Sequence, residues 1–257
     1  MDYTADIKKL PRHFLPHNFS VTTWETLAPF FIDLLERAIN SKTDLEKWLK
    51  DISELEAAIS EDACWRQIRM TCDTENKELE AAFTFFMMEI QPKAQPFADK
   101  LNRKLIDCPF TNELDQQQFF TYLRTIRKNI ELFREENIPL LAEMNVMQQQ
   151  YGMIAGKMTI DVEGKEYTLQ QATKFLEHNN RALRESVYRK IGDRRLQDKE
   201  SLSNLFSSLV EKRHKVALNA GFKNFRDYKF AEMGRFDYKP EDCYQFHQAI
   251  KEKLCRW

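Results

Sequence analysis

Apolar residues recur along most of the chain at the three- and four-residue spacing that marks one face of a helix. The helices that this spacing predicts cover residues 22–38, 43–59, 62–91, 97–105, 115–136, 139–147, 181–195 and 202–217. Pro92 and Pro96 are expected to interrupt the run before the helix that carries Phe97, because proline has no backbone N–H. The pattern therefore favours an antiparallel assembly of helices.

Two Thr-x-x-Glu pairs mark expected helix starts near the N-terminus. Thr22 with Glu25 and Thr43 with Glu46 have the spacing of a capping box, in which each side chain bonds the other residue's backbone N–H. Pro29 lies early in the first helix and is expected either to kink that helix or to mark its real start.

Residues 157–169 break the helical pattern. Apolar and polar residues alternate on both sides of Glu163-Gly164, which is the arrangement of a β-hairpin with a tight turn. Thr168 and Gln171 then have capping-box spacing and are expected to start a short helix. The predicted fold class is therefore mainly α, an antiparallel multi-helix assembly with one small β-hairpin near residues 157–169.

The stretch 209–250 joins the end of a long helix to two further helix starts. Gly221 stands where a helix can end in a left-handed residue. Asn224 can cap a short helix, and Pro240 can begin another because acidic residues follow it in the first turn. At the other end of the chain, Tyr3, Phe14 and Phe19 are expected to anchor an irregular strap over residues 1–20.

Composition narrows the range of functions. Lys plus Arg is 39 against 40 for Asp plus Glu, and the net charge of -1 gives no field that would gather nucleic acid or anionic membrane. The cysteines are odd in number and never form a C-x-x-C pair; they are Cys64, Cys72, Cys108, Cys243 and Cys255. This pattern favours reduced thiols, and the N-terminus has no unbroken apolar stretch, so we expect a cytoplasmic protein.

The histidines offer two candidate metal pairs, and neither carries the chemistry of a complete site. His13 and His17 are four residues apart, but Pro16 disfavours the helix that would bring them together. Glu211 and His214 have the spacing used in di-metal carboxylate bundles, yet no second Glu-x-x-His occurs. We expect all four to be ordinary surface residues.

Other charged and aromatic groups also have structural interpretations. The basic residues of the 181–195 helix alternate with acids, which indicates a solvated face; they are Arg181, Arg184, Arg189, Lys190, Arg194 and Arg195. Phe83, Phe85 and Phe86 are expected in the core. Arg235 and Asp237 lie among aromatic residues, where an ion pair between them would hold the turn together.

The 209–250 stretch also resembles a known family. Lys212-Arg213-His214, Ala220-Gly221-Phe222, Tyr228 and above all Arg235-Phe236-Asp237-Tyr238 resemble the beginning of the peptidase domain of oligoendopeptidase F, a relative of thimet oligopeptidase. The resemblance implies a mostly helical, channelled zinc peptidase that cleaves short peptides. In that family the metal is held by a helical His-Glu-x-x-His and a downstream Glu.

No histidine of this chain is followed by Glu, so that motif is absent from the sequence. We therefore expect no catalytic, cofactor-binding or metal-binding residue here, and zinc only in the full-length family. The resemblance implies an N-terminal helical domain over residues 1–155 and, over 156–257, the hairpin with the start of a peptidase domain truncated before the metal site.

Two functions from different classes follow. The chain is expected to be the N-terminal part of a zinc-dependent oligopeptidase that forms channel wall and lid for short peptides and is inactive alone. It would self-associate through the face that the missing half would cover. The alternative is a free-standing, non-catalytic helical interaction protein.

Overall fold

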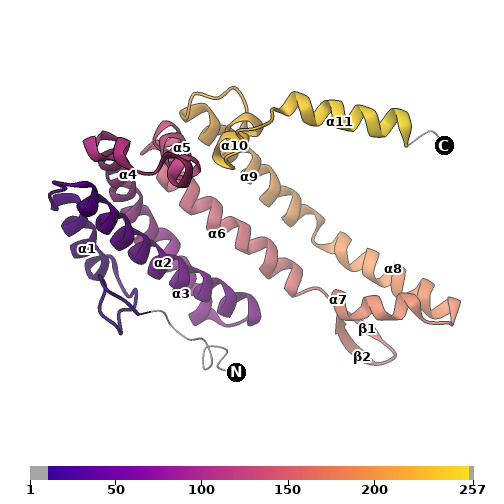
Figure 1. Ribbon diagram of the computed structural model, residues 1–257. Coiled ribbons are helices and arrows are strands. Elements are labelled where there is room, and N and C mark those ends of the chain that lie inside the picture. The colour runs from indigo at the N-terminus through magenta and orange to yellow at the C-terminus, as the bar shows by residue number, and fades with distance from the viewer. Residues whose placement is uncertain (1–10, 255–257) are drawn as a thin grey trace. The chain divides into compact units, whose positions relative to one another are not determined.

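The computed structural model describes residues 11–254, which form helices and one two-stranded sheet (Figure 1). The α-helices are α1 (Trp24–Glu36), α2 (Lys42–Cys72), α3 (Lys77–Phe85), α4 (Gln91–Asp107), α5 (Gln116–Leu132), α6 (Asn137–Gly156), α7 (Leu169–Ala172), α8 (Arg181–Gln197), α9 (Lys199–Asn219), α10 (Phe225–Glu232) and α11 (Pro240–Lys253). Shorter turns of helix are η1 (Phe86–Ile90), η2 (Pro109–Glu113) and η3 (Thr173–Glu177). The predicted fold class, mainly α with one small hairpin, is confirmed.

The described residues group into two compact units. One comprises residues 11–68, 89–135 and 229–254, and the other comprises residues 69–88 and 136–228. The division at residue 155 that the sequence suggested stays a prediction, as does the strap at Tyr3, which lies outside the described residues.

The first two helices begin at caps other than the predicted ones. Helix α1 starts after Thr23, whose backbone N–H donates to Thr26 Oγ1 at 3.3 Å. Before α2, Ser41 Oγ accepts from the Asp44 N–H at 3.1 Å, and the Asp44 carboxylate accepts from the backbone before it. Thr26 and Asp44 thus accept the backbone N–H bonds that the predicted capping boxes assigned to Glu25 and Glu46. Pro29 lies inside α1 and does not start it.

The two prolines predicted to interrupt the helical run do not end it. The chain passes from α3 through the π-helical turn η1 directly into α4, which contains Pro92 at its start and Pro96 in its interior. A proline ring cannot fit beneath the carbonyl four residues earlier, and a local π turn is one way for a helix to rearrange its bonds around that conflict.

The first unit has a buried core shared by several helices. Its largest fully buried side chain is Trp48 of α2, whose indole N–H donates to the Leu34 carbonyl at 2.8 Å. Lys104 of α4 reaches the same end of α1, where its ammonium donates to the carbonyls of Leu34, Leu35 and Arg37 at 2.6–2.9 Å. A lysine from another helix therefore satisfies carbonyls that the end of α1 leaves without partners.

Residues before α1 are attached to α2 by one carboxylate. Glu54 accepts the backbone N–H groups of His13, Phe14 and Leu15 at 2.8–3.2 Å. Burial by itself would raise the pKa of Glu54, but the hydrogen bonds from these three N–H groups lower it below the ordinary 4.5. The segment before α1 is therefore fastened to α2 by hydrogen bonds to one charged side chain.

The second unit contains α6 and α9, which run antiparallel beside each other (Figure 1). Asn137 is buried between them, donating to the Val216 carbonyl at 3.0 Å and accepting from the Asn219 side chain at 2.8 Å. A buried amide that meets both a donor and an acceptor fixes the register of the two helices without leaving an unpaired group.

The predicted hairpin is confirmed. Strand β1 (Thr159–Val162) pairs with β2 (Lys165–Thr168), and the turn residues Glu163 and Gly164 have φ of 55° and 80°. Positive φ at both positions is the type I′ geometry that suits the twist of a hairpin. Its apolar side packs on α7 and α8 in a cluster of Ile160, Val162, Ala172, Val187 and Ile191.

Two glycines end helices in the same way. Gly221 has φ of 84°, and the Phe222 N–H donates to the Ala217 carbonyl at 2.9 Å, which closes α9 as predicted. Gly234 has φ of 63°, and the Arg235 N–H donates to the Phe230 carbonyl at 3.2 Å. The second stop repeats the geometry of the first, although Gly234 was not among the helix ends predicted from the sequence.

Candidate functional site

The histidines considered as metal ligands, His13, His17 and His214, are exposed. His13 and His17 lie in a segment with no helix, so their spacing does not bring them onto one face. Glu211 and His214 are exposed on α9. Within residues 11–254, no group of three or more His, Cys, Asp or Glu side chains is placed to hold a metal ion. A zinc site needs at least three protein ligands, so the described residues do not fit that metal.

The Arg235-Asp237 ion pair proposed from the sequence is wrong. Asp237 instead pairs with Arg124 of α5 at 3.3 Å, and the Arg124 guanidinium also lies 4.2 Å from the centre of the Phe236 ring. Arg235 lies over the ring of Phe230 at 4.7 Å. The turn is held to α5, but by an arginine more than a hundred residues earlier in the chain, which local sequence cannot reveal.

The other side-chain predictions have mixed outcomes. Phe83 and Phe86 are buried as expected, whereas Phe85 is 41% exposed, because three neighbouring residues of a helix cannot all face one side. Arg189 pairs with Glu185 and Lys190 donates to the Asp161 carbonyl, so these members of the basic helix face interact within their own unit.

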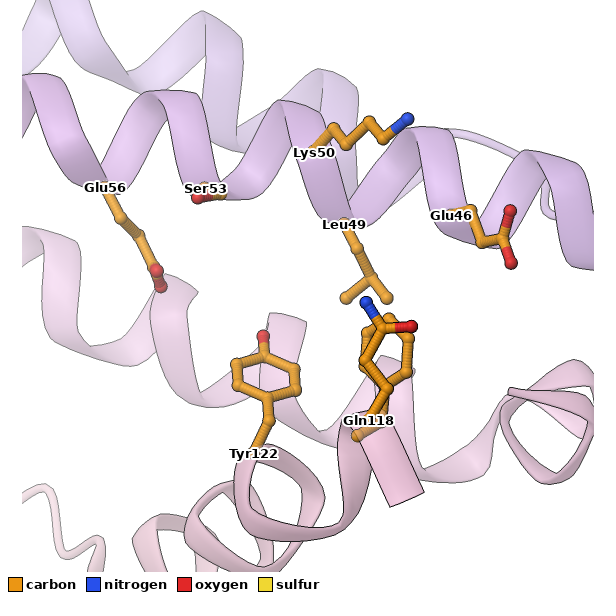
Figure 2. Close-up of a pocket in the computed structure, with 8 residues that line it drawn as sticks. Glu46, Leu49, Lys50, Ser53, Glu56, Gln118 and Tyr122 are labelled. Atoms are coloured by element: carbon orange, nitrogen blue, oxygen red, sulfur yellow. The ribbon is translucent and has the colours of Figure 1, made fainter. Parts of the chain in front are cut away.

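A groove of about 550 Å³ lies between α2 and α5 in the first unit (Figure 2). Its lining residues are Glu46, Leu49, Lys50, Ser53, Glu56, Gln118, Phe119 and Tyr122. A volume of roughly 300–1,000 Å³ is typical of small-ligand sites. The groove combines apolar walls with the carboxylates of Glu46 and Glu56 and the ammonium of Lys50.

The carboxylate of Glu56 and the phenol of Tyr122 lie on opposite sides of this groove. Figure 2 shows them pointing into the same space from opposite helices. Glu56 is exposed to solvent in the groove, yet the surrounding protein removes enough water to raise its pKa, and no hydrogen bond or cation of the described residues offsets that effect. Burial first, and the negative charge of Glu56 second, raise the pKa of Tyr122 to about 12.

A second groove of about 510 Å³ lies in the other unit, between α6 and α9. Gln148 and Arg213 supply its polar groups, and the rest of the lining is Tyr151, Leu202, Leu205, Phe206 and Leu209. Phe206 is 63% exposed at this surface.

None of the helices in the described part of the chain combines the length and apolar character that a bilayer span needs.

Comparison with known proteins identifies the family. The family model described as Peptidase M3 N-terminal domain matches residues 14–133, and the one described as Peptidase family M3 matches residues 174–256. The chain belongs to peptidase family M3. No curated protein sequence matches the chain.

Solved structures of other peptidases have the same fold. An oligoendopeptidase F assigned in Bacillus anthracis is 24% identical, with a TM-score of 0.84 over 91% of this chain and 43% of its own. A second protein assigned as an oligoendopeptidase F is 24% identical, with a TM-score of 0.85 over 93% of this chain and 42% of its own.

A third solved structure, described as PZ peptidase A with an inhibitor, is 22% identical, with a TM-score of 0.85 over 93% of this chain and 43% of its own. The chain therefore spans less than half the length of each of these neighbours. The resemblance stated from the Arg235-Phe236-Asp237-Tyr238 element is confirmed at the level of the family.

Proposed function

We propose that the 257 residues are the N-terminal part of a zinc-dependent oligopeptidase that hydrolyses short peptides. The observation that carries this proposal is the match of two M3 family models in the order of the family, over residues 14–133 and 174–256. The helical fold common to the oligoendopeptidase F structures supports it. In this assembly the chain forms wall and lid of a channel that admits short peptides.

The zinc of such an enzyme is bound by polypeptide other than these residues. The sequence contains no His-Glu-x-x-His, and the donor groups of residues 11–254 do not cluster as three ligands. The chain alone is therefore inactive as a peptidase. Cys64, Cys72, Cys108 and Cys243 are free thiols, which supports a reducing cytoplasmic location.

The chain alone also self-associates through α11. This helix buries none of its residues, although Cys243, Phe246, Ile250 and the following Leu254 recur on one face at helical spacing. We call these four residues the α11 stripe. Phe246 is 64% and Leu254 is 68% exposed, and a row of exposed apolar side chains favours association with a second apolar surface.

Metal content, hydrolysis and peptide binding of the purified 257-residue chain test the proposed function together. Zinc is measured by atomic absorption after dialysis against zinc-containing and then zinc-free buffer. Hydrolysis is followed with internally quenched peptides, and binding is followed by the fluorescence anisotropy of labelled short peptides. A known zinc peptidase serves as positive control for the first two measurements.

We expect far less than one zinc per chain, no hydrolysis, and saturable binding of short peptides. Stoichiometric zinc together with hydrolysis would contradict the claim that the ligands lie on other polypeptide. The absence of binding for every peptide would contradict the role in a peptide channel.

A further inference from the structure

The groove between α2 and α5 holds a negative charge that the protein leaves without a positively charged partner. Burial raises the pKa of Glu56, whereas a nearby cation would have lowered it. The carboxylate of Glu46, at the other end of the groove, lies 3.8 Å from the ammonium of Lys42 on its own helix. The lining cation, Lys50, directs its ammonium away from α5 (Figure 2).

We propose that this groove binds the guanidinium group of an arginine side chain carried by a short peptide. That the arginine belongs to a peptide rests on the proposed function. The preference for a cation rests on the residues that line the groove, above all Glu56 and Tyr122.

The chemistry of the two facing groups suits a guanidinium more closely than other cations. A carboxylate accepts two parallel N–H bonds from the planar guanidinium, and charge-assisted bonds of this kind are stronger than neutral ones. Aromatic rings also attract flat cations, and Tyr122 extends its ring, hydroxyl foremost, into the space that Glu56 enters from the other helix (Figure 2). An ammonium can use the charge but not the bidentate geometry.

The remaining walls suit the stem of the same side chain. Leu49 of α2 and Phe119 of α5 line the groove and are half-buried, so they offer apolar surface to the methylene groups of arginine. An acidic side chain in this position would face two carboxylates, Glu46 and Glu56, against one lining cation, Lys50, whose ammonium points away from α5. Charge therefore selects the basic ligand over the acidic one.

A pair of peptides that differ only in charge tests the proposal on the full chain. Both are acetylated and amidated, and one carries arginine where the other carries citrulline, which has the same shape but no charge. We expect the arginine peptide to bind about tenfold more tightly in fluorescence anisotropy. A lysine peptide should fall between the two.

Substitutions in the groove locate the preference. Glu56→Gln should reduce the ratio of the affinities for the arginine and citrulline peptides to about one. Tyr122→Leu should reduce it in part, whereas Tyr122→Phe, which retains the ring, should keep it. Glu61→Gln is the matched control, because Glu61 is an exposed acid on the same helix and lies outside the groove lining.

Equal affinity for the two peptides, or a ratio unchanged by Glu56→Gln, would overturn the proposal. If peptides bind but show no such ratio, the arginine site alone is wrong and the peptide channel stands. If no peptide binds at all, both proposals fail. If the arginine preference depends on Glu56 while the chain also holds zinc and hydrolyses peptides, only the assignment of the metal site to other polypeptide fails.

Discussion

Helices α1 and α11 have nearly the same length, 13 and 14 residues, and each has an apolar face, but only α1 buries it. Leu27, Phe31 and Leu34 of α1 are at most 3% exposed, and Lys104 and Trp48 bind the carbonyls at its end. Helix α11 has a proline start, an acidic first turn and a basic last turn, but no buried residue. Nearby residues are thus enough to form both helices. Whether a helix becomes part of a core depends on contacts with residues far away in the sequence, such as Trp48 and Lys104 for α1.

The largest expected effect is the loss of a side chain that joins α1 to α2. Trp48→Ala removes a fully buried ring and the hydrogen bond to Leu34, so we expect a loss of about 3–5 kcal/mol in the free energy of unfolding. Urea denaturation followed by circular dichroism measures it. Phe246→Ala on α11 is the comparison, and a change beyond about 0.5 kcal/mol there would contradict the contrast between the two helices.

The elements that sequence predicted are those governed by neighbouring residues. Gly221 ends α9, Asn224 caps α10 through the Asp227 N–H at 3.0 Å, and Glu163-Gly164 turns the hairpin. The helix starts at Thr23 and Ser41 were misplaced because several polar residues stand close together there, and any of them can cap. Spacing alone does not choose among them.

The features that sequence missed depend on residues far apart in the chain. Glu54 meets the N–H groups of residues 13–15 about forty positions earlier, and Arg124 meets Asp237 after more than a hundred. The groove between α2 and α5 likewise unites Glu56 with Tyr122. A one-dimensional pattern states which faces are apolar, but not which helices pack together, so no signal in the sequence alone marked this groove.

An intermediate effect is expected at the anchor of the segment before α1. Glu54→Gln removes the charge that accepts three backbone N–H groups, so we expect a loss of about 1–3 kcal/mol at neutral pH. Hydrogen exchange should quicken at residues 13–15 while the α1 amides remain protected. Glu61→Gln, an exposed neighbour on the same helix, should change neither measurement.

The contribution of the Glu54 carboxylate to the free energy of unfolding should depend on pH. Because the folded protein lowers the pKa of Glu54 below 4.5, its stabilisation is fully present above the unfolded value and is lost as pH falls through the lower, folded value. The difference between the wild type and Glu54→Gln should therefore be constant above about pH 5 and shrink in more acidic buffer. A difference that grew on acidification would show that the carboxylate is not the anchor.

The smallest expected change in stability, and the sharpest test of the comparison, is on α11. Phe246→Ser should leave the free energy of unfolding within about 0.5 kcal/mol, because the ring is 64% exposed. It should nevertheless lower the dimer fraction in sedimentation and the binding of a hydrophobic dye, because the α11 stripe loses its largest member. Gln248→Ser, on the opposite side of the helix, is the control and should alter neither. If Phe246→Ser unfolds the chain as Trp48→Ala does, then α11 is a core helix like α1, and partners from distant sequence do not account for the difference between them.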